Sequence, residues 1–224
     1  MGIDVEFQGR FPIKFRASAH HSAANRKNIK YLKESGPQLA EGTGHLEVAS
    51  ILSPHPALID EATIARRVDE MAGEIANVAG GEMVVVGLLK GCFVFMADLV
   101  RALHRQGVSC TVDFMRLSSY ADAKVSSGSV KMAADVSLDL AGRQVLIVDD
   151  ILDTGRTLAF ARERLQAHRP AGLWTAALLD KPSRRELPFQ ADFVGFAIPD
   201  RFVAGYGIDH AERHRDIPYI VAID

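Results

Sequence analysis

The residues with the clearest potential for chemistry stand in one short segment of the chain, 145–158. Four apolar residues there are followed by the paired acids Asp149 and Asp150 and then by two more apolar residues. The segment continues with a third acid and a small, hydroxyl-rich turn: Asp153, Thr154, Gly155, Arg156 and Thr157. The apolar run predicts a buried strand, and the turn after it predicts the beginning of a helix.

The turn is suited to binding a phosphate monoester. The N-terminus of a helix presents free backbone N–H groups and a partial positive charge. Gly155 allows the backbone to approach a ligand closely, and Thr154 and Thr157 add hydroxyl donors. The sequence holds no Gly-x4-Gly-Lys-Ser/Thr motif, which disfavours a nucleotidase of the phosphate-loop class.

The three carboxylates beside this turn would repel a phosphate unless the ligand also carries a diol or a metal ion. Asp149 and Asp150 are able to accept hydrogen bonds from ribose hydroxyls or to hold Mg²⁺ through water. Asp153 is then available for proton transfer. Any one of these acids alone would also fit a helix cap, but a cap needs one residue and not a whole string in register.

This segment resembles the motif with which type I phosphoribosyltransferases bind phosphoribosyl pyrophosphate (PRPP). The resemblance covers residues 46–224 and implies an α/β fold, a parallel-sheet type I phosphoribosyltransferase core with a small C-terminal hood. It implies that Asp149 and Asp150 contact the ribose diol and its Mg²⁺, and that Asp153 is the catalytic residue near N7 of the purine. It also implies that the turn 154–157 cradles the 5-phosphate.

Further parts of the chain resemble the parts of this family that bind pyrophosphate. Lys90 and Gly91 follow an apolar run, as in the family's pyrophosphate loop, where the peptide before the lysine is cis in several members. The polar loop 117–131 resembles a mobile lid that closes over pyrophosphate and excludes water. Taken singly, these features would also fit an ordinary turn and a surface loop. The pyrophosphate contacts implied by the resemblance are Lys90, Gly91, Ser119, Tyr120 and Arg215.

Residues nearer the C-terminus indicate a 6-oxopurine as the acceptor. Lys181 follows a third apolar run, where an ammonium group donates to a 6-oxo group and is mismatched with the amino group of adenine. The stretches 179–185 and 198–209 resemble those of bacterial hypoxanthine phosphoribosyltransferases. By that resemblance Phe202 stacks on the purine, Val203 offers it backbone groups, and Asp209 holds a second Mg²⁺ through water.

The resemblance therefore implies a purine-salvage enzyme. It would transfer the 5-phosphoribosyl group of PRPP to N9 of hypoxanthine, and of guanine, and release pyrophosphate. Mg²⁺ is the expected cofactor, and PRPP and the base are the expected partners of a homodimer or homotetramer. Two alternatives stay open: a transferase that prefers xanthine or guanine, and a PRPP-sensing regulator on the same fold without catalytic activity.

Apolar periodicity places these residues on a framework of strands and helices. The first helical pattern begins after Asp60, ends at Gly80 and has apolar residues at helical spacing: Ile64, Val68, Met71, Ile75 and Val78. Apolar runs predict strands buried on both faces, with helical patterns between them. We expect the buried strands at 83–89, 144–149 and 173–179, the helices at 93–105 and 155–168, and shorter strands at 109–116, 192–196 and 218–223. This alternation predicts a parallel sheet whose ligands bind at the carboxyl ends of the strands.

Composition limits the class of protein. The chain of 224 residues, 48% of them hydrophobic, is long enough for one domain with a substantial core. The formal net charge of −2 gives no overall attraction for nucleic acid. No apolar run approaches the ~18 residues of a membrane helix and no secretory signal is recognisable, so no membrane is expected. Cys92 and Cys110 have no metal-ligand spacing and are too few for a disulfide framework, which predicts a cytoplasmic protein.

Residues 1–44 differ from the rest of the chain. They hold seven basic against four acidic residues, a net charge of +3, and they show little apolar periodicity. They are predicted to form a basic extension that is disordered in part. Residues 45–224 are predicted to form the phosphoribosyltransferase domain, with the hood mainly from 181–224.

Overall fold

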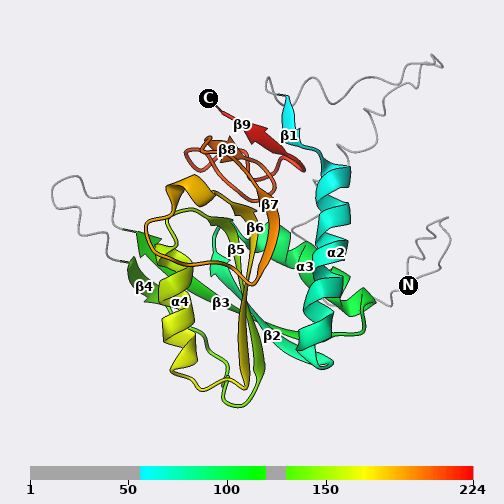
Figure 1. Ribbon diagram of the computed structural model, residues 1–224, viewed down its shortest axis with the longest axis vertical. Helices are drawn as coiled ribbons and strands as arrows, with labels where there is room; N and C mark the ends of the chain where they lie inside the picture. Colours follow the sequence, from blue (N-terminus) through cyan, green and yellow to red (C-terminus); the bar gives the residue numbers. More distant parts are fainter. Residues whose placement is uncertain (1–55, 120–129, 224) are drawn as a thin grey trace, which may run out of the picture. The chain divides into compact units, whose positions relative to one another are not determined.

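The computed structural model describes residues 56–119 and 130–223, which are drawn in colour in Figure 1. The predicted basic extension 1–44 and most of the polar loop 117–131 lie outside the described residues. All the described residues belong to one unit of the chain. No helix in this part of the chain is both long enough and apolar enough to span a membrane.

A six-stranded sheet forms the centre of the fold. Its strands are β2 (Glu82–Leu89), β3 (Ser109–Ser119), β4 (Val130–Ala134), β5 (Gln144–Leu152), β6 (Gly172–Asp180) and β7 (Phe193–Ala197). The strand order is β4-β3-β2-β5-β6-β7, and every neighbouring pair is parallel except β3 and β4. The predicted α/β fold with a parallel sheet is confirmed. The sequence analysis does not predict the antiparallel edge strand β4, which begins inside the predicted polar loop 117–131 and extends three residues beyond it.

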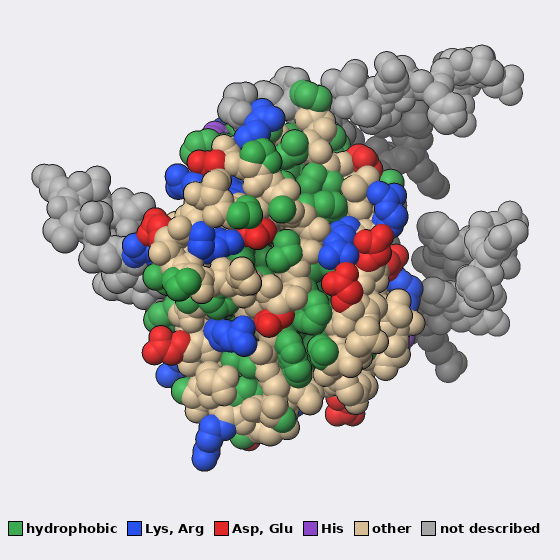
Figure 2. Space-filling view, viewed as in Figure 1, with side chains coloured by type: hydrophobic (Ala, Val, Ile, Leu, Met, Phe, Trp, Pro, Cys, Tyr) green, Lys and Arg blue, Asp and Glu red, His purple; other side chains and the backbone are tan. Residues whose placement is uncertain are grey.

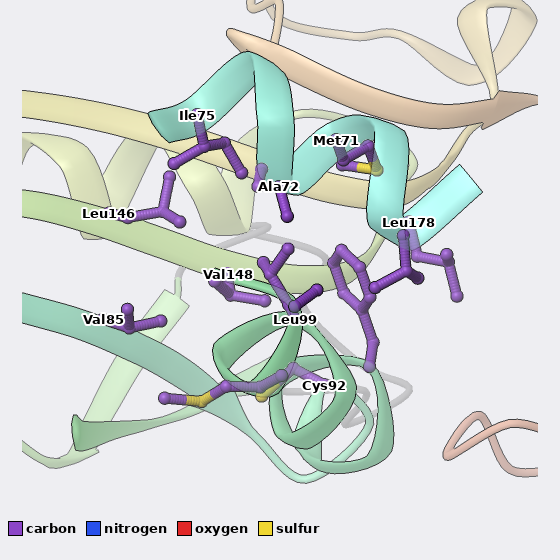
Figure 3. Close-up of a cluster of buried hydrophobic side chains, with 14 of the residues drawn as sticks. Met71, Ala72, Ile75, Val85, Cys92, Leu99, Leu146, Val148 and Leu178 are labelled. Carbon is purple, nitrogen blue, oxygen red and sulfur yellow. The ribbon is translucent and has the colours of Figure 1, made fainter. Parts of the chain in front are cut away.

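The central strands are buried on both faces, as their unbroken apolar runs predict. Successive residues of β2 and β5 alternate between two hydrophobic clusters, with Val85 and Leu146 in the first and Val84 and Val145 in the second. Helices α2 (Glu61–Ala79) and α3 (Phe93–Arg105) pack on the first cluster, and α4 (Arg156–Gln166) packs on the second. Figure 3 shows the first cluster, in which side chains from both helices point toward those of the strands.

The local sequence explains where α2 begins and ends. The carboxylate of Asp60 accepts a hydrogen bond from the backbone N–H of Thr63 (2.8 Å) and so caps the first turn. Gly80 ends the helix in the left-handed conformation, with φ of 66°. The predicted apolar face is buried except at Val78, which is 36% exposed, while Ala79 is buried. The expectation for Val78 is wrong because the core position after Ile75 is Ala79, which is four residues further along the helix, and not Val78, which is three residues further.

Arg67 joins α2 to the edge of the sheet. Its Nε donates to the carbonyl oxygen of Gly195 (3.0 Å) and another guanidinium nitrogen donates to that of Val194 (2.7 Å), both in β7. Glu74, further along α2, holds the same guanidinium at 2.7 Å. The edge strand is therefore fixed to the helix by polar as well as apolar contacts.

A second, smaller sheet contributes to the hood. It consists of β1 (Ala57–Ile59), β8 (Val203–Ala204) and β9 (Ile220–Ala222) in the order β1-β9-β8, with antiparallel pairs. One of its strands, β1, thus precedes α2 in the chain, while the other two follow the main sheet (Figure 1). Val203, Tyr206 and Ile220 belong to the first hydrophobic cluster, so the hood shares its core with the sheet.

Candidate active site

The predicted ligand-binding segments meet at the carboxyl ends of three neighbouring strands. β2 is followed by Lys90 and Gly91, β5 contains the paired acids near its end, and β6 is followed by Lys181. Both β2 and β6 pair with β5 in parallel register. The backbone N–H of Lys181 also donates to the carbonyl oxygen of Leu152 at 2.9 Å. Segments far apart in the sequence therefore form one edge, where ligands of parallel sheets bind.

Asp149 and Asp150 form a pair of carboxylates close to the end of β5. Asp149 is 6% exposed, and its Oδ1 accepts a hydrogen bond from the backbone N–H of Asp150 (3.1 Å). Burial, and then the charge of Asp150, raises the pKa of Asp149 well above its ordinary value of 3.8. Burial also raises the pKa of Asp150, although the N–H of Ile151 and the charge of Arg215 act in the opposite direction. The pair is therefore suited to a ligand that brings hydroxyl donors or a cation.

The loop after β2 packs directly on this acid pair. A Cβ added at Gly91 would lie 2.5 Å from Cγ of Asp150 and closer still to one carboxylate oxygen. The carbonyl oxygen of Gly91 in turn lies against Gly207, where φ is 96° and an added Cβ would clash with that oxygen. Only glycine allows these close approaches. The loop after β2, the acid pair and the hood therefore meet at one point.

The turn after the acid pair is fixed in a conformation suited to an anion. Gly155 has φ of 87°, and α4 begins at the next residue and runs for 11 residues. The carbonyl oxygen of Thr154 accepts hydrogen bonds from the backbone N–H groups of Glu186 (3.0 Å) and Leu187 (3.1 Å). The turn is thereby attached to the segment after β6, and the first N–H groups of α4 lie at the carboxyl edge of the sheet.

Two arginines, which are inconspicuous in the sequence, hold the third acid and its backbone. Nε of Arg184 lies 3.3 Å from Oδ1 of Asp153. Arg185 donates to the carbonyl oxygens of Leu152 (3.2 Å) and Asp153 and pairs with Asp180. In the sequence they belong to the stretch 179–185, which resembles that of bacterial hypoxanthine phosphoribosyltransferases, but nothing there indicates their partners. Asp153, the predicted catalytic residue, thus lies beside a positive charge.

A chain of alternating charges lies near the acid pair and consists of Lys90, Glu212, Arg215 and Asp209. The peptide between Leu89 and Lys90 is cis, as the resemblance implies for several members of the family. Nζ of Lys90 lies 3.0 Å from both carboxylate oxygens of Glu212. Arg215 pairs with Asp209 (2.6 Å) and with Glu212 (3.4 Å). The two cations predicted to contact pyrophosphate are therefore brought together by a glutamate to which the sequence does not point.

The predicted lid can be followed only at its first residues. Ser119 ends β3, where its backbone pairs with Val130 of β4. Tyr120 lies outside the described residues, as do the positions up to 129. The roles of Ser119 and Tyr120 in binding pyrophosphate therefore stay predictions.

Lys181 and Phe202 stand beside each other past the end of β6. Lys181 is 7% exposed and Phe202 is 75% exposed, and Nζ of the lysine lies 6.0 Å from the centroid of the ring. Aromatic side chains are usually part of the core, but this ring is not. An exposed aromatic face beside the ammonium group of a largely buried lysine is suited to a planar ligand that carries an acceptor. Val203, the next residue, is buried in β8.

The acids predicted to hold Mg²⁺ do not form one cage. Among residues 56–119 and 130–223, no three His, Cys, Asp or Glu side chains gather in the manner of a metal site. Mg²⁺ is commonly held by one or two carboxylates together with substrate phosphates, and its other ligands are water. The hard oxygen donors of Asp149 and Asp150 fit that mode of binding. Asp209 would act separately, since its carboxylate pairs with Arg215.

A cavity of about 710 Å³ lies elsewhere, between α2, α3 and the segment 206–218. Tyr206 lines it and donates its hydroxyl hydrogen to Asp98 (2.5 Å). Arg215 also lines this cavity, but none of residues 149–157 does. We therefore place the candidate active site at the strand ends, where the carboxylates and the phosphate turn lie.

Known proteins with similar sequences match most of the chain. The phosphoribosyl transferase domain model matches residues 57–211. Hypoxanthine phosphoribosyltransferase of Escherichia coli is 48% identical over 166 residues, which cover 73% of this chain and 92% of that protein. Hypoxanthine-guanine phosphoribosyltransferase of Bacillus subtilis is 42% identical over 164 residues, which cover 73% of this chain and 89% of that protein. The chain belongs to the phosphoribosyltransferase family.

Solved structures agree with this assignment. A crystal structure of a hypoxanthine-guanine phosphoribosyltransferase from Bacillus anthracis matches with a TM-score of 0.69 and 40% identity, covering 75% of this chain and 98% of that one. A hypoxanthine phosphoribosyltransferase from Trypanosoma cruzi matches with a TM-score of 0.72 and 39% identity, and the match covers 75% of this chain and 91% of that one. This phosphoribosyltransferase therefore has the type I fold that its sequence implies.

Proposed function

We propose that this phosphoribosyltransferase transfers the 5-phosphoribosyl group of PRPP to N9 of hypoxanthine, and of guanine, and releases pyrophosphate in purine salvage. The observation that carries the proposal is that an acid pair, a phosphate turn and a Lys–Phe pair meet at one edge of the sheet. The names of the bacterial relatives, hypoxanthine and hypoxanthine-guanine phosphoribosyltransferase, support the same substrates.

PRPP would bind along the carboxyl ends of β2 and β5. Its 5-phosphate lies on the turn 154–157, where the first N–H groups of α4 and the threonine hydroxyls donate to it. Arg156 begins that helix. The ribose diol donates to Asp149 and Asp150, and these bonds offset the cost of their burial. The pyrophosphate group would contact Lys90, Gly91, Ser119, Tyr120 and Arg215.

The purine would bind between the end of β6 and the hood. Its ring stacks on Phe202, whose 75% exposure leaves a face open to a ligand. Its 6-oxo group accepts a hydrogen bond from Lys181, and its edge meets the backbone of Val203. The amino group of adenine would place a donor against the ammonium donor, and mismatches of this kind discriminate strongly between substrates.

Asp153 would act as the general base of the transfer. As N9 attacks C1 of the ribose, the bond from C1 to the pyrophosphate oxygen breaks, and its electron pair leaves with pyrophosphate. Asp153 accepts or relays the proton from N7, and Arg184, 3.3 Å away, orients its carboxylate. General-base catalysis contributes about 10²–10⁴-fold. Lys90 and Arg215 stabilise the charge that develops on the departing group.

Mg²⁺ is the proposed cofactor, held by Asp149 and Asp150 and, at a second position, by Asp209. When bound, the metal neutralises charge on PRPP and on the departing pyrophosphate. The acid pair supports this assignment, because two neighbouring carboxylates with raised pKa values gain most from a cation.

We further propose a homodimer or homotetramer that works in the cytoplasm. Phe93 of α3 and Val112 and Phe114 of β3 are 45%, 43% and 39% exposed, and the last two share one face of their strand. Covering these side chains at a contact between copies would remove apolar area from water, which supports the proposed association. Cys92 and Cys110 are both free, which suits a reducing compartment. Sedimentation of the purified protein tests the assembly, and a monomer at micromolar concentration would contradict it.

The function is tested by offering hypoxanthine, guanine, xanthine and adenine separately, with PRPP and Mg²⁺, and by following nucleotide formation. Turnover with a 6-oxopurine and none with adenine supports the proposal and ranks the substrates. Binding of PRPP without turnover of any base would favour the alternative, a PRPP-sensing regulator without catalytic activity. On the face shown in Figure 2, basic and acidic side chains are interspersed rather than gathered into a basic field, which disfavours a nucleic-acid-binding regulator.

A further inference from the structure

The space between Lys90 and Arg215 is occupied by a side chain of the protein itself. Both carboxylate oxygens of Glu212 accept hydrogen bonds from Nζ of Lys90 at 3.0 Å, and one of them lies 3.4 Å from Arg215. We propose that the carboxylate of Glu212 occupies the pyrophosphate subsite of the free enzyme and leaves it when PRPP or pyrophosphate binds. This inference rests on the proposed function, which gives the same two cations to pyrophosphate.

The contacts of Arg215 and the Lys90–Glu212 ion pair differ in how easily a ligand can displace them. Arg215 is 19% exposed, pairs with Asp209 at 2.6 Å and donates to the carbonyl oxygen of Gly207 at 2.8 Å, so it is firmly placed. Lys90 and Glu212 are 52% and 67% exposed, and exposed ion pairs are weak because water and salt screen them. Hydrogen bonds from Lys90, and then from Arg215, lower the pKa of Glu212 and keep it charged at neutral pH. The Lys90–Glu212 pair is therefore charged and yet readily exchanged.

The backbone that carries Glu212 is in an unfavourable conformation. His210 and Arg213 exchange backbone hydrogen bonds of 3.1 Å around a two-residue loop, and the two loop residues, Ala211 and Glu212, have φ of 53° and 61°. Loops with positive φ at both central positions favour Asn-Gly, because a Cβ is disfavoured in this region. Local preference therefore does not explain a glutamate here, whereas its contacts with two cations of the site do.

Exchange of Glu212 for pyrophosphate has a direct consequence for binding. A ligand with several negative charges must displace one carboxylate from Lys90 and Arg215, so Glu212 weakens the binding of PRPP and of pyrophosphate alike. After transfer, the same carboxylate competes with pyrophosphate for Lys90 and favours release of the product. Glu212 thus sets the affinity of the subsite without contacting the purine.

The test is the substitution Glu212→Gln, which keeps the size of the side chain and removes its charge. Calorimetry with pyrophosphate and Mg²⁺ should give a Kd about two- to fivefold lower than for the wild type, the range expected for an exposed ion pair. Inhibition by pyrophosphate should strengthen by the same factor, while KM for hypoxanthine stays unchanged. The difference should fade near 1 M salt, where the Debye length is about 3 Å.

Two matched variants separate charge from other effects. Glu74→Gln removes one carboxylate from an exposed ion pair with Arg67 on α2, away from the site. Ala211→Gly relieves the neighbouring positive φ but leaves the Glu212 carboxylate in place. Both should bind pyrophosphate as the wild type does, and equal tightening in Ala211→Gly would assign the effect to the loop and overturn the proposal.

The outcomes also separate this inference from the proposed function. Turnover and pyrophosphate binding by the wild type, with equal or weaker binding by Glu212→Gln, would overturn the role of Glu212 alone. Failure of the wild type and of Glu212→Gln to bind either PRPP or pyrophosphate would overturn both proposals.

Discussion

The substitution Gly91→Ala tests whether the contact between the loop after β2 and Asp150 is needed for catalysis. The added Cβ would lie 2.5 Å from Cγ of Asp150. Carbon atoms in contact stand about 3.5 Å apart, so the loop or the carboxylate must move by about 1 Å or more. A displacement of about 1 Å in a catalytic site costs about 100-fold in rate. This factor corresponds to about 2.7 kcal/mol of transition-state stabilisation.

We therefore expect Gly91→Ala to lower kcat/KM for PRPP about 100-fold while the fold persists. Steady-state kinetics measure the loss, and thermal unfolding followed by circular dichroism checks the fold. Gly73→Ala in α2 is the matched control, because a Cβ there meets no atom within 4 Å. It should keep full activity and raise the free energy of unfolding by about 0.5–1 kcal/mol. Activity of Gly91→Ala close to that of the wild type would refute the idea that the loop and Asp150 act together.

Three further predictions concern single side chains. Asp153→Ala should lower kcat about 10²–10⁴-fold and leave the Kd for PRPP nearly unchanged, and comparable losses in turnover and in calorimetric affinity would exclude a catalytic role. Lys181→Met should lower kcat/KM for hypoxanthine about 10- to 100-fold, because a hydrogen bond from a charged donor is lost. It should also lower the ratio of kcat/KM for hypoxanthine to kcat/KM for adenine. A ratio equal to that of the wild type would disprove the role of Lys181 in choosing the base. Partial burial of Asp113 raises the pKa of its carboxyl group, but hydrogen bonds to the carboxylate lower it by more. The bond from the backbone N–H of Leu138 is the most important of these, and the pKa lies below its ordinary value of 3.8. A lowered pKa in the folded state stabilises the protein above the unfolded pKa, and this contribution is lost as pH falls through the folded pKa. Asp113→Asn should therefore unfold more easily at pH 7, and urea titrations should show the difference shrinking below pH ~4; a difference independent of pH would contradict this.

The features that could be predicted from the sequence are those encoded locally. Strands β2, β5 and β6 need unbroken apolar runs because both of their faces are buried, so their positions could be predicted from the sequence. The segment 149–157 could be recognised for a different reason, which is that its acids, glycine and threonines lie within nine neighbouring positions of the chain. Strand β4 could not be predicted, because it lies at the edge of the sheet, where pairing with β3 replaces burial as the source of order.

The pairs formed across the chain could not be predicted. Glu212 meets Lys90 across 122 positions, and Arg184 meets Asp153 across 31. Glutamates and arginines are common on every protein surface, so neither is distinctive until the fold supplies its partner. The exposure of Phe202 is a second example, because an aromatic residue in a sequence favours the core and only the fold shows whether anything covers it.

The attachment of β7 to α2 bears on how the protein behaves in crowded solution. The outer strand of a sheet offers unsatisfied N–H and carbonyl groups, and a strand of another molecule can add to it, which is a route to aggregation. The guanidinium of Arg67 engages the carbonyl groups of Val194 and Gly195 in this outer strand and places a positive charge beside it. A charge at a sheet edge is a common natural protection against such additions. One arginine thus helps to keep separate copies from joining through their sheets.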